Sequence, residues 1–307
     1  MSYSKAYSKK ILAVGSMALD SVKTPFGSVR EALGGSVTFF SASARFFSSV
    51  SVVAVVGTDF PKKHLDLLKK LGVDTGNISV AQGKTFRWEG EYNFDLNTAN
   101  TLKTELNVFA DFKPKIMPEH RKSPIVFLAN IHPEIQHSVL SQIDKPALTA
   151  CDTMNYWIQS QKKSLLSLLK RVDIFLCNDA EARELTGEYS LIAAARFVLS
   201  RGPKIFVIKK GEDGVLCFTK ESIFSAPAFL LEKVFDPTGA GDTFAGGFVG
   251  YLSGVKKVND QSIRKAIVYG TVLASYNVES FSLTRLAGLK PADIEKRYTA
   301  FENLTKF

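Results

Sequence analysis

A glycine-rich segment between two aspartates is the part of the sequence with the clearest chemistry. It runs Asp236-Pro-Thr-Gly-Ala-Gly-Asp242 and continues Thr-Phe-Ala-Gly-Gly-Phe. Gly239-Ala240-Gly241 can bring successive backbone N–H groups together as an anion-binding nest. We expect a helix to begin at Asp242, with free N–H groups and a positive dipole end that favour an anion. Because Asp242 places a carboxylate where that anion would lie, the segment indicates a base beside a transferring phosphoryl group.

The sequence lacks the other common phosphate-binding motifs. No G-x-x-x-x-G-K-[ST] run occurs, because Gly83-Lys84-Thr85 lacks the upstream glycine. The dinucleotide fingerprint is excluded as well, since Phe244 stands where its third glycine would be. Taken alone, the segment also fits a glycine turn followed by an aspartate that caps a helix.

Short apolar runs alternate with helical patterns along most of the chain. This alternation predicts a parallel sheet with helices on both faces. Helical spacing is found at 163–171, 180–185 and 191–200. Asp59 is predicted to cap a helix that has Pro61 in its first turn. The predicted strands are Ile11–Val14, Val50–Val56, Ile125–Ala129, Ala147–Ala150, Val172–Cys177 and Ile205–Ile208.

Two stretches interrupt the alternation, residues 16–35 and residues 83–110. The second contains Lys84-Thr-Phe-Arg-Trp-Glu-Gly-Glu-Tyr-Asn-Phe-Asp-Leu, in which apolar and polar residues alternate with period two. Such alternation is typical of exposed antiparallel strands. We therefore predict a small β-layer inserted into the α/β core, where it would cover a cleft.

The bulk composition narrows the class of protein. Of the 307 residues, 45% are hydrophobic and 22% charged, which is ordinary globular composition. The formal net charge is +9, but no run of five Lys or Arg occurs, so we interpret it as a solvated surface and expect no nucleic-acid partner. No stretch reaches the roughly 18–20 apolar residues of a membrane helix, and no signal peptide is evident. We expect no membrane partner, a cytoplasmic location and buried, reduced thiols at Cys151, Cys177 and Cys217.

The segment at 236–242 resembles the C-terminal signature of the PfkB, or ribokinase-like, family of carbohydrate kinases. Further motifs agree in order along nearly the whole chain. Gly15-Ser16 through Asp20 is similar to the family's first strand and its substrate-binding aspartate, and Gly34-Gly35 is similar to the diglycine that opens the next helix. The remaining matches are Gly57-Thr58-Asp59, Asn178-x-x-Glu181 and Lys209-Lys210-Gly211-Glu-Asp-Gly214.

The resemblance implies a fold and a reaction. The fold would be a Rossmann-like, three-layer α/β/α core of the ribokinase-like kind with a small β-sheet lid. The core would comprise residues 1–15, 36–82 and 111–307, and the lid residues 16–35 and 83–110. The enzyme would be a transferase that uses ATP and Mg²⁺ and moves the γ-phosphoryl group to a primary hydroxyl of a sugar or sugar derivative.

The resemblance also implies roles for individual residues. Asp242 would be the base, and its pKa is expected to be low because it lies at a helix N-terminus, so positioning would count for more than basicity. The anion hole would be made by Gly239, Ala240 and Gly241. The acceptor-binding residues would be Asp20, Gly34, Gly35 and Asp59. The nucleotide-binding residues would be Asn178, Lys209, Gly211 and Gly214, with Glu181 acting on Mg²⁺ through water.

Some of these motifs have a second interpretation. Asn178-Asp-Ala-Glu181 is also a capping box, and the two roles are compatible. Asp236 and Thr238 resemble the first half of a monovalent-cation site, but residues 270–282 show no clear second half. Asp152 and Asn155 follow a predicted strand, and similar strand ends in the family face the phosphates or the substrate.

The acceptor is the least determined feature. A sugar is favoured, and a nucleoside, as in the adenosine-type kinases of the same family, is the alternative. Phe39, Phe86, Trp88 and Tyr92 could stack on a base, although the last three could equally pack within the β-layer. An exposed strand of that layer could pair with a second copy to form a homodimer. A non-catalytic, nucleotide-binding regulator is a third interpretation, which the intact Gly-Ala-Gly-Asp motif disfavours.

Overall fold

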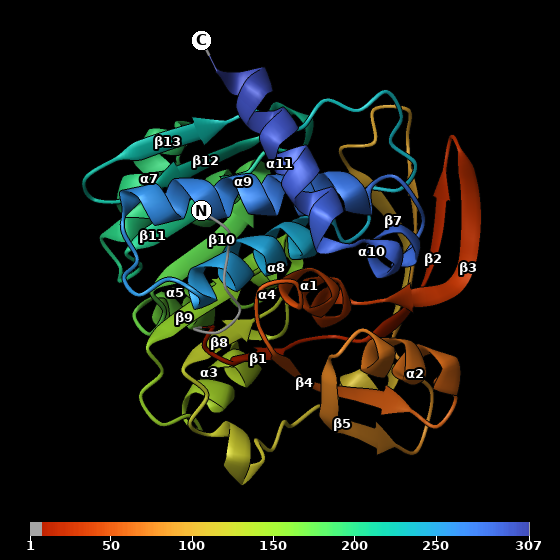
Figure 1. The fold of residues 1–307 in the computed structure, drawn as a ribbon. Helices are drawn as coiled ribbons and strands as arrows, with labels where there is room; N and C mark the ends of the chain where they lie inside the picture. The colour runs from red at the N-terminus through yellow and green to blue at the C-terminus, as the bar shows by residue number, and fades with distance from the viewer. Residues whose placement is uncertain (1–7, 307) are drawn as a thin grey trace.

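The computed structural model describes residues 8–306, and its largest element is a nine-stranded sheet (Figure 1). The strand order is β13-β12-β11-β10-β9-β8-β1-β4-β5. The strands from β11 to β5 are parallel, and β12 and β13 are antiparallel at one edge. Their bounds are β1 Ile11–Val14, β4 Val50–Gly57, β5 Asp74–Ala81, β8 Ile125–Leu128, β9 Leu148–Asp152, β10 Ile174–Asn178, β11 Ile205–Lys209, β12 Val215–Phe218 and β13 Ile223–Ala226.

Helices cover both faces of this sheet, each over its own apolar cluster (Figure 1). One layer consists of α1 Ser36–Ala44, α2 Lys62–Lys70, α8 Ala240–Ser253, α9 Asp260–Asn277, α10 Thr284–Gly288 and α11 Pro291–Thr305. The other consists of α3 Pro133–Leu140, α4 Asn155–Ser160, α5 Lys162–Leu169, α6 Asp179–Thr186 and α7 Leu191–Leu199. The predicted three-layer α/β/α core is therefore confirmed.

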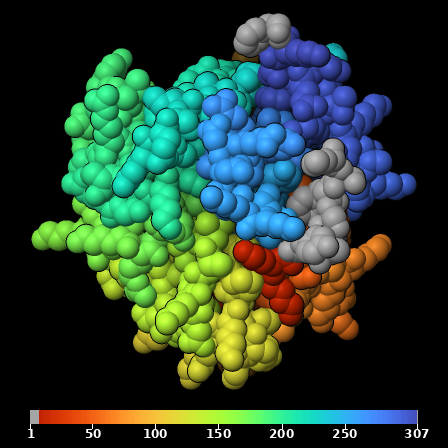
Figure 2. Space-filling model, turned by 60° about the vertical axis from the view of Figure 1, so that its left-hand side comes forward, coloured from red at the N-terminus to blue at the C-terminus, as the bar shows by residue number. Residues whose placement is uncertain are grey.

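The start of the described chain lies against the first helix layer. The Lys9 N–H donates to the carbonyl of Ser253, the last residue of α8, at 3.1 Å. Figure 2 shows the red N-terminal residues beside the blue C-terminal helices on this face. No helix within residues 8–306 is long and apolar enough to cross a membrane.

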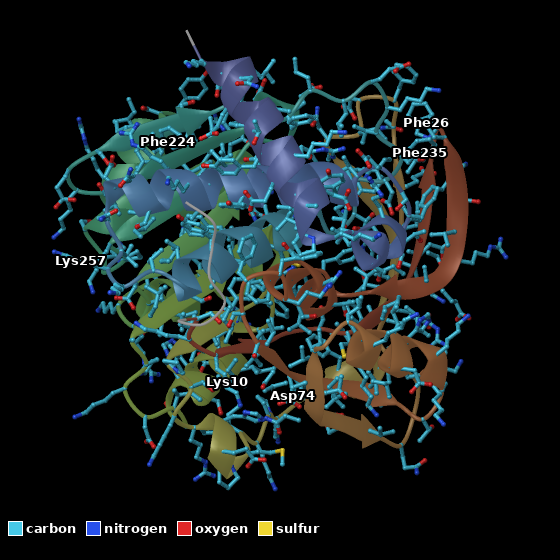
Figure 3. The ribbon with its side chains drawn as sticks, viewed as in Figure 1. Lys10, Phe26, Asp74, Phe224, Phe235 and Lys257 are labelled. Carbon is cyan, nitrogen blue, oxygen red and sulfur yellow. The ribbon has the colours of Figure 1, made fainter. Side chains whose placement is uncertain are left out.

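A second, four-stranded sheet stands beside the core, and we call it the β-layer. Its strands are β2 Ala18–Thr24, β3 Gly27–Gly34, β6 Arg87–Tyr92 and β7 Ala99–Glu105, in the order β3-β2-β6-β7. All four come from the two stretches that interrupt the α/β alternation. The pairs β2–β3 and β6–β7 are antiparallel, whereas β2 and β6 are parallel. The turn between β2 and β3 reaches the loop before α8, where the rings of Phe26 and Phe235 lie 5.9 Å apart (Figure 3).

Two predicted helix starts are wrong. The helix after β4 begins at Lys62 with Pro61 as its N-cap, so Asp59 is not the cap. The helix of the glycine-rich segment begins at Ala240, two residues earlier than predicted, with Gly239 as its N-cap. Gly239 allows the earlier start because it adopts a φ of 74°, which side-chain-bearing residues avoid.

Candidate active site

The loop into α8 is shaped by a close contact between Gly239 and an aromatic ring of α1. A Cβ atom at position 239 would overlap the ring of Phe39, so only glycine fits there. The Ala240 N–H already donates to the Pro237 carbonyl at 3.1 Å. Asp242 is the third residue of the helix, and the first-turn N–H groups have no acceptor within the helix. The first turn of α8 therefore supplies donors beside Asp242, with Ala240 already engaged.

Asp242 holds its proton far more tightly than an ordinary aspartate. Its pKa is raised to about 8, chiefly by burial and then by the negative charge of Asp152, against the positive charge of Lys209, which lowers it. The prediction of a low pKa from the helix end is therefore wrong, because loss of hydration outweighs the helix dipole. Once ionised, a carboxylate with a pKa near 8 is a stronger proton acceptor than an ordinary aspartate.

Three polar residues lie at the carboxyl ends of adjacent parallel strands. Asp152 ends β9, Asn178 ends β10 and Lys209 ends β11. The Lys209 Nζ donates to the Asp152 Oδ2 at 2.6 Å, and both side chains are largely buried. The same ammonium lies 3.1 Å from where a Cβ of Gly241 would be. The strand order thus brings a cation to the first turn of α8.

Asn178 and Glu181 form the capping box that the sequence predicts. The Asn178 Oδ1 accepts from the Glu181 N–H, and the Asn178 N–H donates to the Glu181 Oε2, both at 2.7 Å. Burial raises the pKa of Glu181 to about 7, while the positive charge of Lys209 lowers it. Glu181 also accepts a hydrogen bond from the backbone of Asn155. The box holds a buried carboxyl group beside Lys209.

Asp20 on β2 sits directly over the diglycine. Any Cβ at Gly34 would overlap the Asp20 carboxyl group, and the Gly35 N–H donates to that group. Burial raises the pKa of Asp20 to about 7, the Gly35 hydrogen bond lowers it, and the nearby charge of Asp236 raises it. Asp20 also raises the pKa of Asp242. The structure therefore brings together the predicted acceptor residues Asp20, Gly34 and Gly35 near Asp242.

The loop at Asp236 packs against the segment that follows α9. The buried Asp236 Oδ1 accepts from the Thr238 N–H at 2.9 Å, and its carboxyl group also accepts from the backbone of Ser282. The Asn277 Nδ2 donates to the Thr238 carbonyl at 2.8 Å. Residues 277–282 thus adjoin Asp236 and Thr238, although their sequence shows no recognisable pattern.

Three of the four candidate stacking aromatics have partners elsewhere in the protein. Phe39 is buried beneath Gly239. Phe86 stacks on Phe109, with ring centroids 5.4 Å apart. Trp88 donates from Nε1 to a threonine of β7 at 3.2 Å, and its ring covers a glycine of its own strand.

Tyr92, the fourth of these aromatics, faces the site. Its Oη lies 3.3 Å from the Thr238 Oγ1. Burial raises its pKa to about 12; the hydrogen bond to Thr238 lowers it, and the charges of Asp236, Asp20 and Asp242 raise it. Tyr92 therefore extends from the β-layer to the loop that precedes α8.

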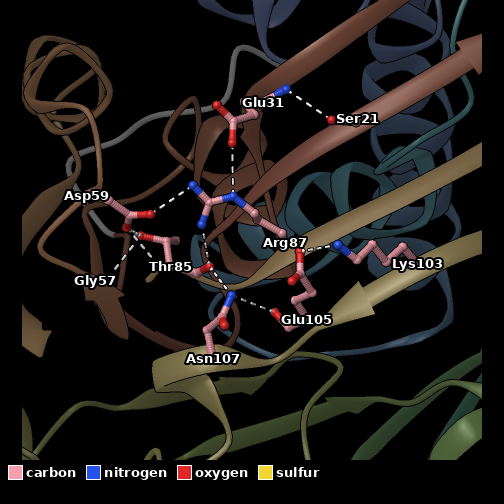
Figure 4. A network of polar contacts seen from close by, with 9 residues as sticks. All are labelled: Ser21, Glu31, Gly57, Asp59, Thr85, Arg87, Lys103, Glu105 and Asn107. Carbon is pink, nitrogen blue, oxygen red and sulfur yellow. Dashed lines mark hydrogen bonds and ion pairs between the residues drawn. The ribbon is translucent and has the colours of Figure 1, made fainter. Parts of the chain in front are cut away.

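Asp59 joins the core to the base of the β-layer (Figure 4). Its Oδ1 accepts from both the N–H and the hydroxyl of Thr85 at 2.7 Å, and its Oδ2 pairs with Arg87 at 2.8 Å. Arg87 also binds Glu31 of β3 at 2.9 Å. Desolvation raises the pKa of Asp59, but these bonds outweigh it and leave that pKa low. Both carboxylate oxygens are thus engaged away from Asp20 and Asp242.

The loop with Gly211 and Gly214 contacts the β-layer. It contains a short 3-10 turn at Gly211–Asp213, with φ values of 56° at Gly211 and 84° at Gly214. The Asn97 Nδ2, from the β6–β7 connection, donates to the Glu212 Oε1 at 3.0 Å. A Cβ at Gly211 would lie 2.7 Å from the Asn97 Oδ1. The tip of the β-layer therefore rests on the loop predicted to bind the nucleotide.

The sequence analysis missed Asn130, two residues beyond the end of β8. Its Oδ1 is buried and has no hydrogen-bond partner in the described part of the chain. β8 lies between β1 and β9, so Asn130 follows the same edge of the sheet as Asp152. A polar residue directly after an apolar strand is the signal that could have identified it. Among residues 8–306, no three His, Cys, Asp or Glu side chains form a group that could hold a metal ion.

Known proteins share both the sequence and the fold of this chain. The model of the family described as pfkB family carbohydrate kinase matches residues 8–287. The cytidine kinase of Thermococcus kodakarensis is 31% identical over 251 residues, which cover 80% of this chain and 89% of the relative. The resemblance predicted from the motifs is therefore confirmed.

Two solved structures show the same fold. The nucleoside kinase of Burkholderia thailandensis in complex with ADP-inosine superimposes with a TM-score of 0.80 at 16% identity, covering 97% of this chain and 96% of that one. A putative ribokinase II from E. coli in complex with ATP and Mg²⁺ superimposes with a TM-score of 0.78 at 16% identity, covering 95% and 99%.

Proposed function

Because this chain belongs to the pfkB family of carbohydrate kinases, we propose that it phosphorylates the 5′-hydroxyl of a ribonucleoside. Family membership confirms the predicted reaction class, an ATP-dependent phosphotransferase with an alcohol acceptor. The choice of acceptor and the roles of the residues below are our proposal.

The observation that carries the proposal is that two differently charged groups, Lys209 and Asp20, both act on the carboxyl group of Asp242. The cation of Lys209 lies toward the strand ends β9 to β11, and the carboxyl group of Asp20 lies over the diglycine. Both alter the pKa of Asp242. A base so placed can take a proton from a hydroxyl held by Asp20 while a phosphoryl group approaches from the side of Lys209.

The transfer follows from these positions. Asp242 takes the proton of the acceptor hydroxyl, the oxygen forms a bond to the γ-phosphorus, and the bond from that phosphorus to the β–γ bridging oxygen breaks to release ADP. The Gly239–Gly241 turn and Lys209 stabilise negative charge on the transferring group. The formal net charge of +9 is not required for this stabilisation, because Lys209 acts on the phosphoryl group at short range.

The nucleotide would lie along the ends of β10 and β11. Asn178, Gly211 and Gly214 would hold it, and Lys209 would face its phosphates. Mg²⁺ usually binds through one or two carboxylates plus phosphate oxygens. The buried carboxyl group of Glu181, with Asp152 nearby, fits a contact made through water. When bound, Mg²⁺ would neutralise charge on the phosphate oxygens.

A monovalent cation would bind beside Asp236. The buried Asp236 carboxylate and the neighbouring turn at Thr238 supply oxygen atoms, and residues 277–282 enclose them. Turnover in K⁺ should then exceed turnover in choline at equal ionic strength. Equal rates in the two salts would remove this part of the proposal.

The acceptor side favours a ribose ring. The Asp20 carboxyl group and the diglycine suit vicinal hydroxyls, and the unpartnered Asn130 Oδ1 can accept a further hydrogen bond. A free sugar and a nucleoside share these hydroxyls. We favour the nucleoside because the relative at 31% identity is a cytidine kinase. Asp59 would act on the acceptor only indirectly, through Thr85 and Arg87.

The β-layer would act as a lid and, through its outer strand, as a dimer surface. Tyr92 and Asn97 connect it to the loops on the two sides of the site. Closure would exclude water and so limit hydrolysis of ATP.

The edge strand β7 is exposed along nearly its whole length and could pair with a second copy. Sedimentation of a β7 variant with a central proline tests the dimer.

The test of the acceptor is a titration with cytidine, uridine, adenosine, inosine, ribose, fructose and 2-keto-3-deoxygluconate, read as ADP release from Mg·ATP. We expect saturable turnover with at least one nucleoside at a higher kcat/KM than with any free sugar. Asp20→Asn should lower kcat/KM for the acceptor more than for ATP. Saturable turnover with a free sugar only would overturn the nucleoside proposal.

A further inference from the structure

Asp152 at the end of β9 holds the Lys209 ammonium in place. Its Oδ2 accepts from the Lys209 Nζ at 2.6 Å, and its Oδ1 accepts from the Thr153 N–H at 2.8 Å. The residue is 2% exposed, and its carbonyl accepts from the Gln136 Nε2 at 3.1 Å. The backbone of Asp152 is therefore held by α3 and its carboxylate by the Thr153 N–H, both independently of Lys209.

Lys209 requires a fixed, negatively charged partner because its buried ammonium lies far from its own strand. β11, which it ends, is separated from β9 by β10, so the side chains of Lys209 and Asp152 together bridge two strand spacings, or about 10 Å. A lysine side chain is a flexible stem with a point charge at its end. A buried ammonium without a counter-ion would be strongly destabilised. Asp152 supplies both the counter-ion and the fixed end point.

The Lys209 ammonium, held by Asp152, lies beside the first turn of α8. The Lys209 Nζ, Cδ and Cε lie 3.1, 3.5 and 3.6 Å from where a Cβ of Gly241 would be. A Cβ at position 241 would thus be in tight contact with the ammonium, which would have to shift by a few tenths of an ångström. Gly241 leaves room for the Lys209 ammonium, and Asp152 binds it.

We propose that Asp152 is a positioning residue for phosphoryl transfer, holding the Lys209 ammonium over Gly241 before the nucleotide arrives. The inference rests on the proposed function, since it assigns Lys209 to the phosphoryl group. Preorganised charge of this kind lowers the barrier because little reorganisation remains at the moment of reaction. Asp152 itself makes no contact with the reacting atoms.

The test compares Asp152→Asn, Lys209→Met and the double variant, on whichever acceptor the wild-type protein uses best. Asparagine keeps the oxygen for Thr153 but turns an amide toward the ammonium, so Lys209 should leave Gly241. We expect kcat to fall about 10- to 100-fold in Asp152→Asn, the size of loss that a small misplacement causes. The KM for Mg·ATP should change by less than about threefold. The double variant should be no slower than Lys209→Met.

A matched control and a second variant distinguish the positioning role of Asp152 from a general effect of removing a charge. Asp173 precedes β10 at the opposite end of the strands and pairs with Lys204 at 2.8 Å, so Asp173→Asn should leave kcat unchanged. Asp152→Glu keeps the charge but moves it by one methylene, and should still lower kcat about tenfold. Wild-type kcat in Asp152→Asn, or losses that multiply in the double variant, would overturn the proposal. A wild-type protein that phosphorylates only a free sugar would refute the proposed acceptor and leave this comparison intact.

Discussion

The Oη of Tyr92 lies 3.3 Å from the Oγ1 of Thr238, so a hydroxyl from the β-layer contacts the loop that leads into α8. These two residues are 146 positions apart, and the contact joins the β-layer to the loop just before the first turn of α8, which carries Asp242. The position of the β-layer and the position of Asp242, the proposed base, are thereby connected.

Removing this hydroxyl should weaken acceptor binding. Tyr92→Phe keeps the ring and loses one hydrogen bond, which is worth roughly 1 kcal/mol or about fivefold in an equilibrium constant. We expect the acceptor KM to rise about fivefold with little change in the KM for Mg·ATP, as measured by initial rates. Tyr156→Phe, at a tyrosine that is 54% exposed on α4, is the control. An acceptor KM equal to that of the control would refute the connection.

The rate should rise with pH, because the base must be deprotonated. Burial raises the pKa of Asp242 to about 8 in the ligand-free protein. Since kcat/KM reports the free enzyme, it should increase about tenfold per pH unit below pH 8 and level off above it. The groups that set this pKa are Asp152, Lys209, Asp20 and Glu181. A profile that is flat between pH 6 and pH 8 would contradict the assignment of Asp242 as base.

The same carboxyl group should make the folded protein less stable at alkaline pH. The pKa of Asp242 is about 8 when folded, against about 3.9 for an unfolded aspartate. The folded state therefore binds the extra proton between these values, so stability falls as pH rises toward 8. Asp242→Asn should raise the melting temperature at pH 8.5 by several degrees and change it little at pH 4.

The control for this comparison is Asp66→Asn, at an exposed aspartate of α2. Its melting temperature should follow that of the wild-type protein at both pH values. A gain at pH 8.5 that is equal for Asp66→Asn and Asp242→Asn would show a general charge effect and contradict the prediction.

The tip of the β-layer should contribute to nucleotide binding. The Asn97 Nδ2 donates to the Glu212 Oε1 at 3.0 Å, next to the turn at Gly211. We expect Asn97→Ala to raise the KM for Mg·ATP about threefold to fivefold, since one hydrogen bond to a charged group is lost. Glu212→Ala should raise the KM for Mg·ATP by a similar factor, and the double variant should show no larger increase than either single variant. Asn100→Ala, whose bond at 3.3 Å lies within the β-layer, is the control; an equal effect there would contradict the prediction.

The sequence predicts six strands of the main sheet, β1, β4 and β8 to β11, because their signal is local, but it does not predict β5, β12 and β13. The runs at 11–14 and 125–129 are apolar and β-branched, and burial on both faces requires just that composition. The start of α8 was misplaced because the N-cap is a glycine without a capping side chain. Only its φ of 74° marks the boundary, and no residue pattern encodes it.

The candidate site depends on contacts between distant segments, which the sequence does not display. Asp59 was expected to cap its own helix and bind the acceptor, but its partners Thr85 and Arg87 lie 26 and 28 positions further on. Lys209 pairs with Asp152 because the strand order brings β9 and β11 to either side of β10. The pKa of Asp242 depends on burial that only the assembled core provides.

The most direct test of the central claim follows the phosphoryl group itself, by ³¹P NMR of Mg·ATP with the best nucleoside. The wild-type protein should convert it to the nucleoside 5′-monophosphate and ADP. Asp242→Asn should remain folded, bind Mg·ADP with near wild-type affinity and form product at least about 10³-fold more slowly, the loss expected when a group acting in the transition state is removed. Formation of the monophosphate by Asp242→Asn at close to the wild-type rate would contradict the assignment of Asp242 as the base.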